Sequence, residues 1–331
     1  ARPGVAASIS VDGNMIISGI STLGSTSFTA DATINNVTVG EGAGSIASNT
    51  VVGNAAFDAN TTGAQNVSIG RNTLTENTTG NNNTAVGDGA LAGNTTASKN
   101  TAIGKNALYS NTTGEHNTAV GQEALAASTT ADDNVAVGRY ALNANTTGAN
   151  NVAVGSGALD ANTTASNNVA VGKDALGANT TGGDNTAVGD RCLDANTTAS
   201  ANTAMGSGAM GSTTTGNQNT AIGSGALSSN TNGSENTVLG YNALDANTSG
   251  GSNVAVGKQA LTASSTGSYN TAVGTNALAA NTTASNNEAI GYNAMAANTT
   301  GSSNVAVGSY ALDANTTGSN NAAFGTHALT S

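Results

Sequence analysis

The sequence predicts an all-β protein, a parallel β-solenoid in which each coil is one 17-residue repeat. The motif Asn-x-Ala-Val-Gly recurs every 17 residues from Asn49 to the end of the chain, without an insertion or deletion. Large apolar residues keep fixed offsets in the repeat, and Gly, Asn and Thr, which disfavour helix interiors, make up about half of it. Because loops tolerate length changes cheaply, so strict a period implies that every residue of the unit has a fixed place, as in stacked coils.

Composition excludes several classes of protein. Only 8% of the 331 residues are charged, whereas an ordinary globular domain is about a quarter charged. Polar repeats also favour disorder, but disordered chains do not keep Val and Leu at fixed offsets for sixteen periods. A net charge of −11 argues against nucleic-acid binding through a basic patch. The sequence has no long apolar run, so we expect no membrane insertion, and its single cysteine, Cys192, excludes an intrachain disulfide.

Each repeat, numbered from its Asn, is expected to contain two strands, at positions 1–4 and 7–10. The Gly at position 5 permits a corner, and the Asn-Thr-Thr-Gly segment at positions 12–15 has turn chemistry. Coils stacked about 4.8 Å apart would make a rod on the order of 80 Å long. We expect the position 1 side chains to form a ladder of amides between coils, at Asn49, Asn66, Asn83, Asn100, Asn117, Asn134, Asn151 and Asn168. The corner glycines are Gly53, Gly70, Gly87, Gly104, Gly121 and Gly138.

The alternation within the first strand predicts which side chains fill the coil. Position 4 is always Val, Ile, Leu, Met or Phe, and position 9 is Leu, Met or Phe, so both are expected to point inward. Position 3, which is Ala in fourteen of seventeen repeats, then lies on the other face. A strand that is apolar on both faces is covered on both faces, so we expect the alanine face to pack on a neighbouring chain. Glu288, at position 2, is the one residue that fits this scheme poorly.

The variable positions hold most of the charge and the tyrosines. Positions 6, 7 and 10 are therefore expected to face solvent, and two interpretations stay open: ordinary solubility, or a stripe that contacts a receptor. The candidate surface-contact residues are Tyr140, Tyr241, Tyr292 and Tyr310.

The chain divides into three segments. Residues 1–35 lack the period and are expected to form an N-terminal β connector or trimerising stub. Residues 36–48 carry the first copy of the motif but are shorter than a repeat, so we expect a shortened entry coil. Residues 49–331 form the solenoid of sixteen 17-residue repeats plus a partial seventeenth, and because Ser331 ends within a repeat, we expect the natural protein to continue.

The repeat Asn-Thr-Ala-Val-Gly-x-x-Ala-Leu-x-x-Asn-Thr-Thr-Gly resembles two related groups of proteins. One is the head of trimeric autotransporter adhesins, and the other is the repeat array in tail fibres of tailed phages, notably cyanophages. The similar array covers about 85% of the chain, and the stretch from Val11 to Gly24 also resembles phage-fibre connectors. The adhesin repeats are shorter, so we expect a longer loop at Asn-Thr-Thr-Gly. The resemblance implies a homotrimeric rod of left-handed parallel β-rolls.

A repetitive rod without a catalytic constellation predicts a non-enzymatic structural role. His116 and His327 lie about twelve repeats apart, and no phosphate-binding loop is present, so we expect no catalytic residues, cofactor or metal. We expect a virion tail-fibre shaft, outside the cell, that presents a host-binding tip. Its expected partners are further copies of itself and host cell-surface glycans or proteins, but not nucleic acid.

Two alternatives stay open. One is an extracellular filament or trimeric autotransporter-type adhesin on a bacterial cell surface. In a glycosylated filament, Asn-x-Thr sequons such as those at Asn60, Asn111 and Asn315 would carry sugar. The other is an ice- or carbohydrate-binding solenoid that uses its regular Thr arrays.

Overall fold

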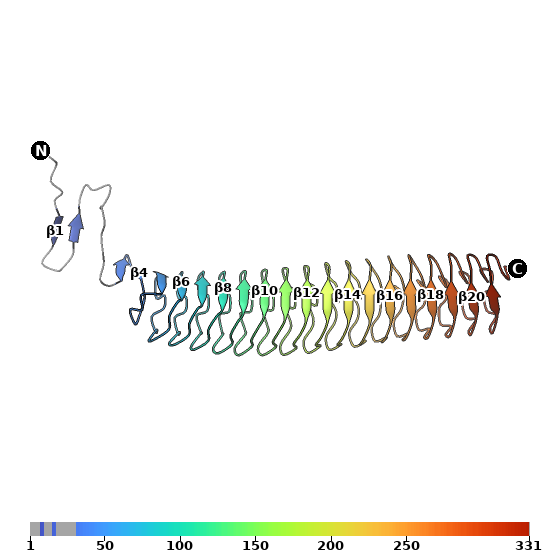
Figure 1. Cartoon of the computed structure of the whole chain (residues 1–331), viewed down its shortest axis with the longest axis horizontal. Helices are drawn as coiled ribbons and strands as arrows, with labels where there is room; N and C mark the ends of the chain where they lie inside the picture. Colours follow the sequence, from blue (N-terminus) through green and yellow to red (C-terminus); the bar gives the residue numbers. More distant parts are fainter. Residues whose placement is uncertain (1–6, 10–14, 18–30, 331) are drawn as a thin grey trace, which may run out of the picture.

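The computed structural model describes residues 7–9, 15–17 and 31–330. The described residues form strands and turns, without a helix, and most of them build one rod of stacked coils (Figure 1). The strands are β1 (Ala7–Ile9), β2 (Met15–Ile17), β3 (Ala32–Ile34), β4 (Val37–Gly40), β5 (Thr50–Gly53), β6 (Val67–Ile69), β7 (Thr84–Val86), β8 (Thr101–Ile103), β9 (Thr118–Val120), β10 (Val135–Val137), β11 (Val152–Val154), β12 (Val169–Val171), β13 (Thr186–Val188), β14 (Thr203–Met205), β15 (Thr220–Ile222), β16 (Thr237–Leu239), β17 (Val254–Val256), β18 (Thr271–Val273), β19 (Glu288–Ile290), β20 (Val305–Val307) and β21 (Ala322–Phe324).

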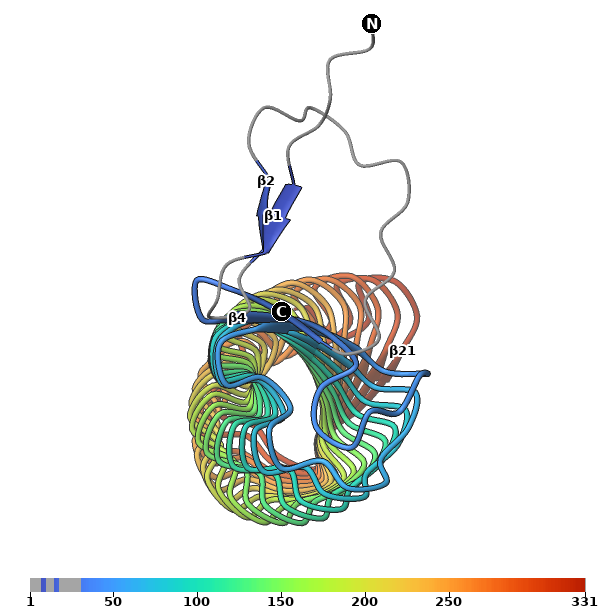
Figure 2. The ribbon, with the colours of Figure 1, turned by 90° about the vertical axis from the view of Figure 1, so that its left-hand side faces the viewer.

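From β5 onward, each coil contributes one strand to a parallel sheet that runs along the rod. Each strand pairs with the strand of the next coil at an offset of one repeat, so that Ala85 pairs with Ala102 and Val86 with Ile103. The prediction of an all-β parallel solenoid with 17-residue coils is therefore confirmed. Figure 2 looks along the rod and shows the coils stacked behind one another around a common axis.

The second strand expected at positions 7–10 is absent from the coils, which form a continuous turn at positions 6–11 instead. Positions 7 and 9 both adopt left-handed backbone angles, as in Asn106 with φ 55° and Leu108 with φ 51°. A segment in which every second residue has a positive φ cannot form an extended strand. The turn still bonds to its neighbours, because Leu91 N–H donates to Ala107 O at 3.0 Å and Gly93 N–H donates to Tyr109 O at 2.9 Å.

The leucine at position 9 combines backbone strain with burial. A left-handed conformation costs a non-glycine residue roughly 1–2 kcal/mol. Leu91, Leu108 and Leu125 are fully buried, and burial of a leucine contributes about 1.5–3 kcal/mol. Burial and the hydrogen bond to the next coil together outweigh the strain, so position 9 points inward as predicted.

The prediction for position 4 is wrong, because its side chains lie on the outside of the coil. Val86, Val137 and Val188 are only half-buried, and Ile103 is 40% exposed. Position 3 is the buried one, as Ala85, Ala102 and Ala119 show. The interior is narrow, and the alanines at positions 3 and 8, the leucine at position 9 and buried amides at positions 1 and 12 fill it. A branched side chain at position 3 is correspondingly rare, and Val238 is such a case.

Short antiparallel strands precede the rod. β1 pairs with β2, β3 with β4, and β4 runs antiparallel to β5. The segment 36–48, which we expected to form a shortened entry coil, thus begins with a strand that opposes the direction of the coils. Both carboxylate oxygens of Asp31 accept backbone N–H groups, from Glu41 at 2.6 Å and Gly42 at 2.8 Å. Most of the expected connector at residues 1–35, and most of the stretch from Val11 to Gly24, lies outside the described residues.

Candidate functional site

The asparagines at position 1 form a ladder inside the rod. Asn83 Oδ1 accepts the backbone N–H of Asn100 in the next coil at 3.0 Å, and Asn83 Nδ2 donates to Ala97 O in its own coil at 2.9 Å. The side-chain oxygens of the ladder thus accept hydrogen bonds from backbone N–H groups as well as from neighbouring side-chain amides. Both bonds recur at Asn49, Asn66, Asn83, Asn100, Asn117, Asn134 and Asn151, whereas Asn168 Nδ2 donates to Ser166 O at 3.3 Å. These residues are buried, so they hold coils together and cannot contact a ligand on the surface.

A second ladder at position 12 was missed by the sequence analysis. Asn94 Nδ2 donates to Asn77 Oδ1 in the preceding coil at 2.7 Å and to Ala97 O at 3.0 Å. Asn60 and Asn111 belong to this ladder and are buried, so a sugar on either would have to displace the interior. The available signal was that Asn occurs at position 12 almost as regularly as at position 1. Ser128, Thr213 and Ser264 interrupt the ladder.

The corner glycines are required for two reasons. Gly70, Gly87, Gly104, Gly121 and Gly138 have φ between 128° and 137°, which L side chains rarely adopt. A Cβ atom on Gly121 would also lie 2.5 Å from the carbonyl oxygen of Gly138 in the next coil. Gly53 has the same crowding, since an added Cβ would overlap the carbonyl oxygen of Gly70. The glycines therefore allow neighbouring coils to stack closely.

The four candidate tyrosines lie on the surface but do not form one site. Tyr292 and Tyr310 meet edge to face with ring centroids 5.3 Å apart, and His327 stacks on Tyr310 at 4.9 Å. Tyr140 lies under the guanidinium of Arg139, whose carbon is 4.8 Å from the ring centroid. Tyr241 is 54% exposed, in a coil remote from both Tyr140 and the Tyr292–Tyr310 pair.

A groove around Tyr109 is the surface feature that sequence reasoning did not find. A hollow of about 560 Å³ lies on one side of Tyr109, and a second of about 370 Å³ lies on the other. Both are lined by Asn106, Tyr109 and Ser110, so the two hollows adjoin along the rod. The available signal was that Tyr109 is the one tyrosine at position 10 of the repeat.

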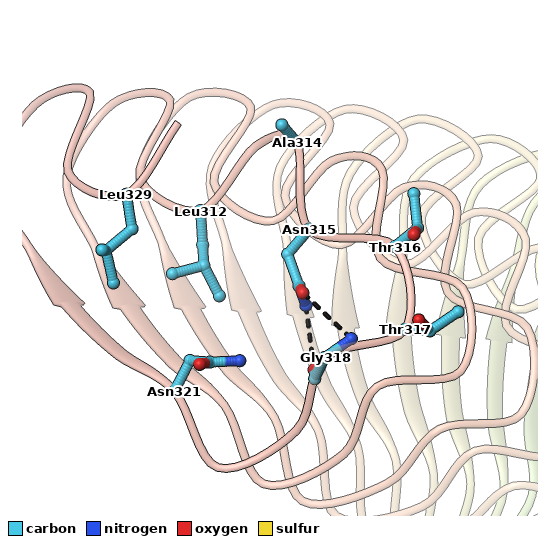
Figure 3. Close-up of a pocket in the computed structure, with 8 residues that line it drawn as sticks. All are labelled: Leu312, Ala314, Asn315, Thr316, Thr317, Gly318, Asn321 and Leu329. Atoms are coloured by element: carbon cyan, nitrogen blue, oxygen red, sulfur yellow. Dashed lines mark hydrogen bonds between the residues drawn. The ribbon is translucent and has the colours of Figure 1, made fainter. Parts of the chain in front are cut away.

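A further hollow, of about 350 Å³, lies at the C-terminal end of the described coils. Figure 3 shows Leu312, Leu329, Asn315 and Asn321 around it, with Asn315 hydrogen-bonded to both backbone groups of Gly318 at 3.0 Å. The equivalents of Leu312, Asn315 and Asn321 are buried in the coils before them. The hollow is therefore the end of the stacked interior.

The described residues offer little reactive chemistry. They contain no cluster of three or more His, Cys, Asp or Glu side chains suited to a metal ion. Cys192 is fully buried, and burial raises the pKa of its thiol to about 12. No helix in this part of the chain is long and apolar enough to cross a membrane.

No family model, curated protein or solved structure matches the chain, so its own surface geometry is what indicates a function.

Proposed function

We propose that this chain is a non-enzymatic shaft or adhesion segment of a phage tail fibre, outside the cell, in which three copies of the rod associate side by side. The observation that carries the proposal is the outer face of the β-sheet, formed by positions 2 and 4 of the coils. The number three and the phage setting come from the resemblance of the repeat to tail-fibre and adhesin arrays.

The outer sheet face carries a row of large apolar side chains along the whole rod. Position 4 is a large apolar residue in all seventeen coils, and position 2 is mostly Thr or Val. Glu288 is the single charged residue on this face, although the chain has 27 charged residues (8 basic and 19 acidic). A stripe about 80 Å long exceeds the apolar patches of monomeric soluble proteins. Its most exposed position 4 members are Ile69, Ile103, Met205, Ile222, Leu239, Ile290 and Phe324.

A second copy of the same rod matches this face best. The side chains repeat at the spacing between coils, so two copies can stand side by side with each ridge facing an equivalent ridge. Each rod has one such face. If the faces of the copies turn toward a common axis, each rod contacts its neighbours and the assembly is closed. The association thus uses position 4, and not the position 3 alanines that the sequence alone suggested.

An adhesin or filament on a cell would associate through the same sheet face, so its location is what distinguishes it from a tail fibre. Ice binding through the Thr array of the Asn-Thr-Thr-Gly segment has less support. The position 13 hydroxyls already donate to the next coil, as Thr95 Oγ1 does to Thr112 O at 3.1 Å, and the segment is a bend instead of a flat strand.

Sedimentation or light scattering of the purified chain tests the assembly. We expect a homotrimer at micromolar concentration, and a stable monomer would contradict the proposal. The variant Val120→Gln/Val137→Gln/Val154→Gln should dissociate into folded monomers. A matched variant, Thr130→Gln/Thr147→Gln/Thr164→Gln, changes exposed positions in the same coils and should stay assembled.

Gold-labelled antibodies against the folded rod test its location. Labelling along the tail fibres of purified virions is the expected result. Labelling of cell-surface filaments without virions would place the chain in a cellular adhesin.

A further inference from the structure

The groove around Tyr109 lies over a coil with small side chains. In the coil that begins at Asn83, the outward positions 7, 10 and 11 are Gly89, Ala92 and Gly93. The coils on either side carry longer side chains at the same positions or next to them, including Glu76 and Tyr109. One coil of small residues between coils of large ones leaves the hollow of about 560 Å³.

Tyr109 separates this hollow from the second one. Ala126 and Ala127 line the second hollow, and Glu123 and Asn143 provide polar groups there. Tyr109 is 49% exposed, so its ring is available from solvent. The groove is therefore polar at both ends, with an aromatic ring in the middle.

The charged groups along the groove have mixed signs. Arg71 and Asp88 form an ion pair at 2.8 Å, in which the Arg71 side chain is 63% and the Asp88 side chain 39% exposed. Lys105 also lines the hollow and makes no salt bridge among the described residues. Glu76 adds a second carboxylate. The groove thus offers both donors and acceptors, without a net excess of positive charge.

This chemistry selects among possible ligands. An apolar peptide would bury Lys105 and Glu76 without partners, which is unfavourable. A polyanion would meet the carboxylates of Glu76 and Asp88. A neutral sugar fits, because its hydroxyl groups can both donate to carboxylates and accept from Lys, Arg and amide groups, while its C–H face packs on a tyrosine ring.

We propose that the groove around Tyr109 binds a neutral oligosaccharide, with adjacent sugar units in the two hollows and Tyr109 between them. The inference rests on the proposed role as an exposed fibre segment, and it assigns one site on the shaft to glycan contact. Several chains in one fibre would present several copies of the groove, so weak single contacts would add up.

A printed array of neutral and acidic oligosaccharides, probed with the fluorescently labelled full chain, tests the inference. We expect retention on at least one neutral oligosaccharide of two or more sugar units. Titration of that oligosaccharide by calorimetry then compares variants. Tyr109→Ala should weaken binding by roughly tenfold or more, because it removes the aromatic platform.

A second variant fills the groove and has a closely matched control. Gly89→Asn introduces a residue that other coils carry at position 7 with positive φ, such as Asn72 and Asn106. Its Cβ would lie 2.6 Å from the side-chain oxygen of Asn106, and the Cβ of Gly157→Asn would lie 2.6 Å from that of Asp174, outside the groove. Both glycines have φ near 70°, at 71° and 69°. We expect Gly89→Asn to lose binding and Gly157→Asn to bind as wild type.

The outcomes separate this inference from the proposed function. A wild-type chain that assembles but binds no neutral oligosaccharide overturns the groove and leaves the fibre proposal standing. Binding that survives both Tyr109→Ala and Gly89→Asn in folded protein, or that is confined to acidic glycans, also overturns the groove. Tyr109-dependent binding by a chain that stays monomeric would support the groove and contradict the assembly.

Discussion

Asn111 and Ser128 occupy the same interior position in successive coils, and both Asn111 Oδ1 and Ser128 Oγ are buried without a hydrogen-bond partner among the described residues. In the intact ladder the next asparagine supplies the missing bond, as Asn111 Nδ2 does for Asn94 Oδ1 at 3.0 Å. Serine lacks an amide, so the ladder stops. Asn196 and Thr213 repeat the same relationship, with both side-chain oxygens unpaired.

Completing the ladder should stabilise the rod. Ser128→Asn provides an amide for Asn111 Oδ1, and a buried polar group that gains its partner contributes about 1 kcal/mol. We expect slower hydrogen exchange in the coils around residue 128 and a higher midpoint of unfolding in urea. The converse variant, Asn162→Ser, removes the amide that donates to Asn145 Oδ1 at 2.9 Å and should lower the midpoint, so equal midpoints for both would contradict the argument.

Corner glycines and turn glycines should respond differently to alanine. Gly121→Ala combines φ of 137° with a Cβ 2.5 Å from Gly138 O, and we expect a loss of at least about 2 kcal/mol in stability. Gly177→Ala is the control, since the nearest atom to its added Cβ is a side-chain oxygen of Asp194 at 3.2 Å and other coils have Ala there, such as Ala92. Thermal unfolding of both variants would refute the explanation if Gly177→Ala were the more damaging.

Cys192 should be unreactive in the folded rod. Its side chain is buried, and its thiol pKa of about 12 leaves almost no thiolate at pH 8. We expect iodoacetamide to label Cys192 in urea but not in native buffer, and Cys192→Ala to fold normally because Ala is usual at this position. Rapid labelling of native protein at a rate independent of urea would show that the side chain is accessible.

Stability should depend on the ionisation of Asp194. Partial burial, and secondly the negative charge of Asp174, raise the pKa of Asp194 above its ordinary value of 3.8. The folded state then holds the proton more tightly than the unfolded state, so this contribution is full below pH 3.8 and is lost as the pH rises through the folded-state pKa. Asp194→Asn should therefore unfold at a higher temperature than wild type at pH 7, with the difference shrinking below pH 3.8. A difference that grows in acid would have the wrong sign.

The sequence by itself determined the repeat, the coil length and the parallel stacking, because an uninterrupted period leaves only equivalent neighbours for each residue. It also determined that Leu91 and its equivalents point inward and that a glycine is needed at positions such as Gly121. These features depend on one residue type recurring at one offset, which is visible without coordinates.

Only the tertiary structure decided which face of the strand is inside. Alternation places Ala85 and Val86 on opposite faces, but both are apolar, so hydrophobicity cannot choose between them. The choice depends on the narrow interior of the closed coil, which holds alanine beside the amides of Asn83 and Asn94 in most coils and only occasionally a valine such as Val238. The left-handed angles at Leu91 and its equivalents, and the hollow beside Tyr109, likewise depend on how the turn closes and on side chains of three neighbouring coils. The pattern of one repeat does not contain this information, because the closed turn and the hollow arise only when the coils stack on one another.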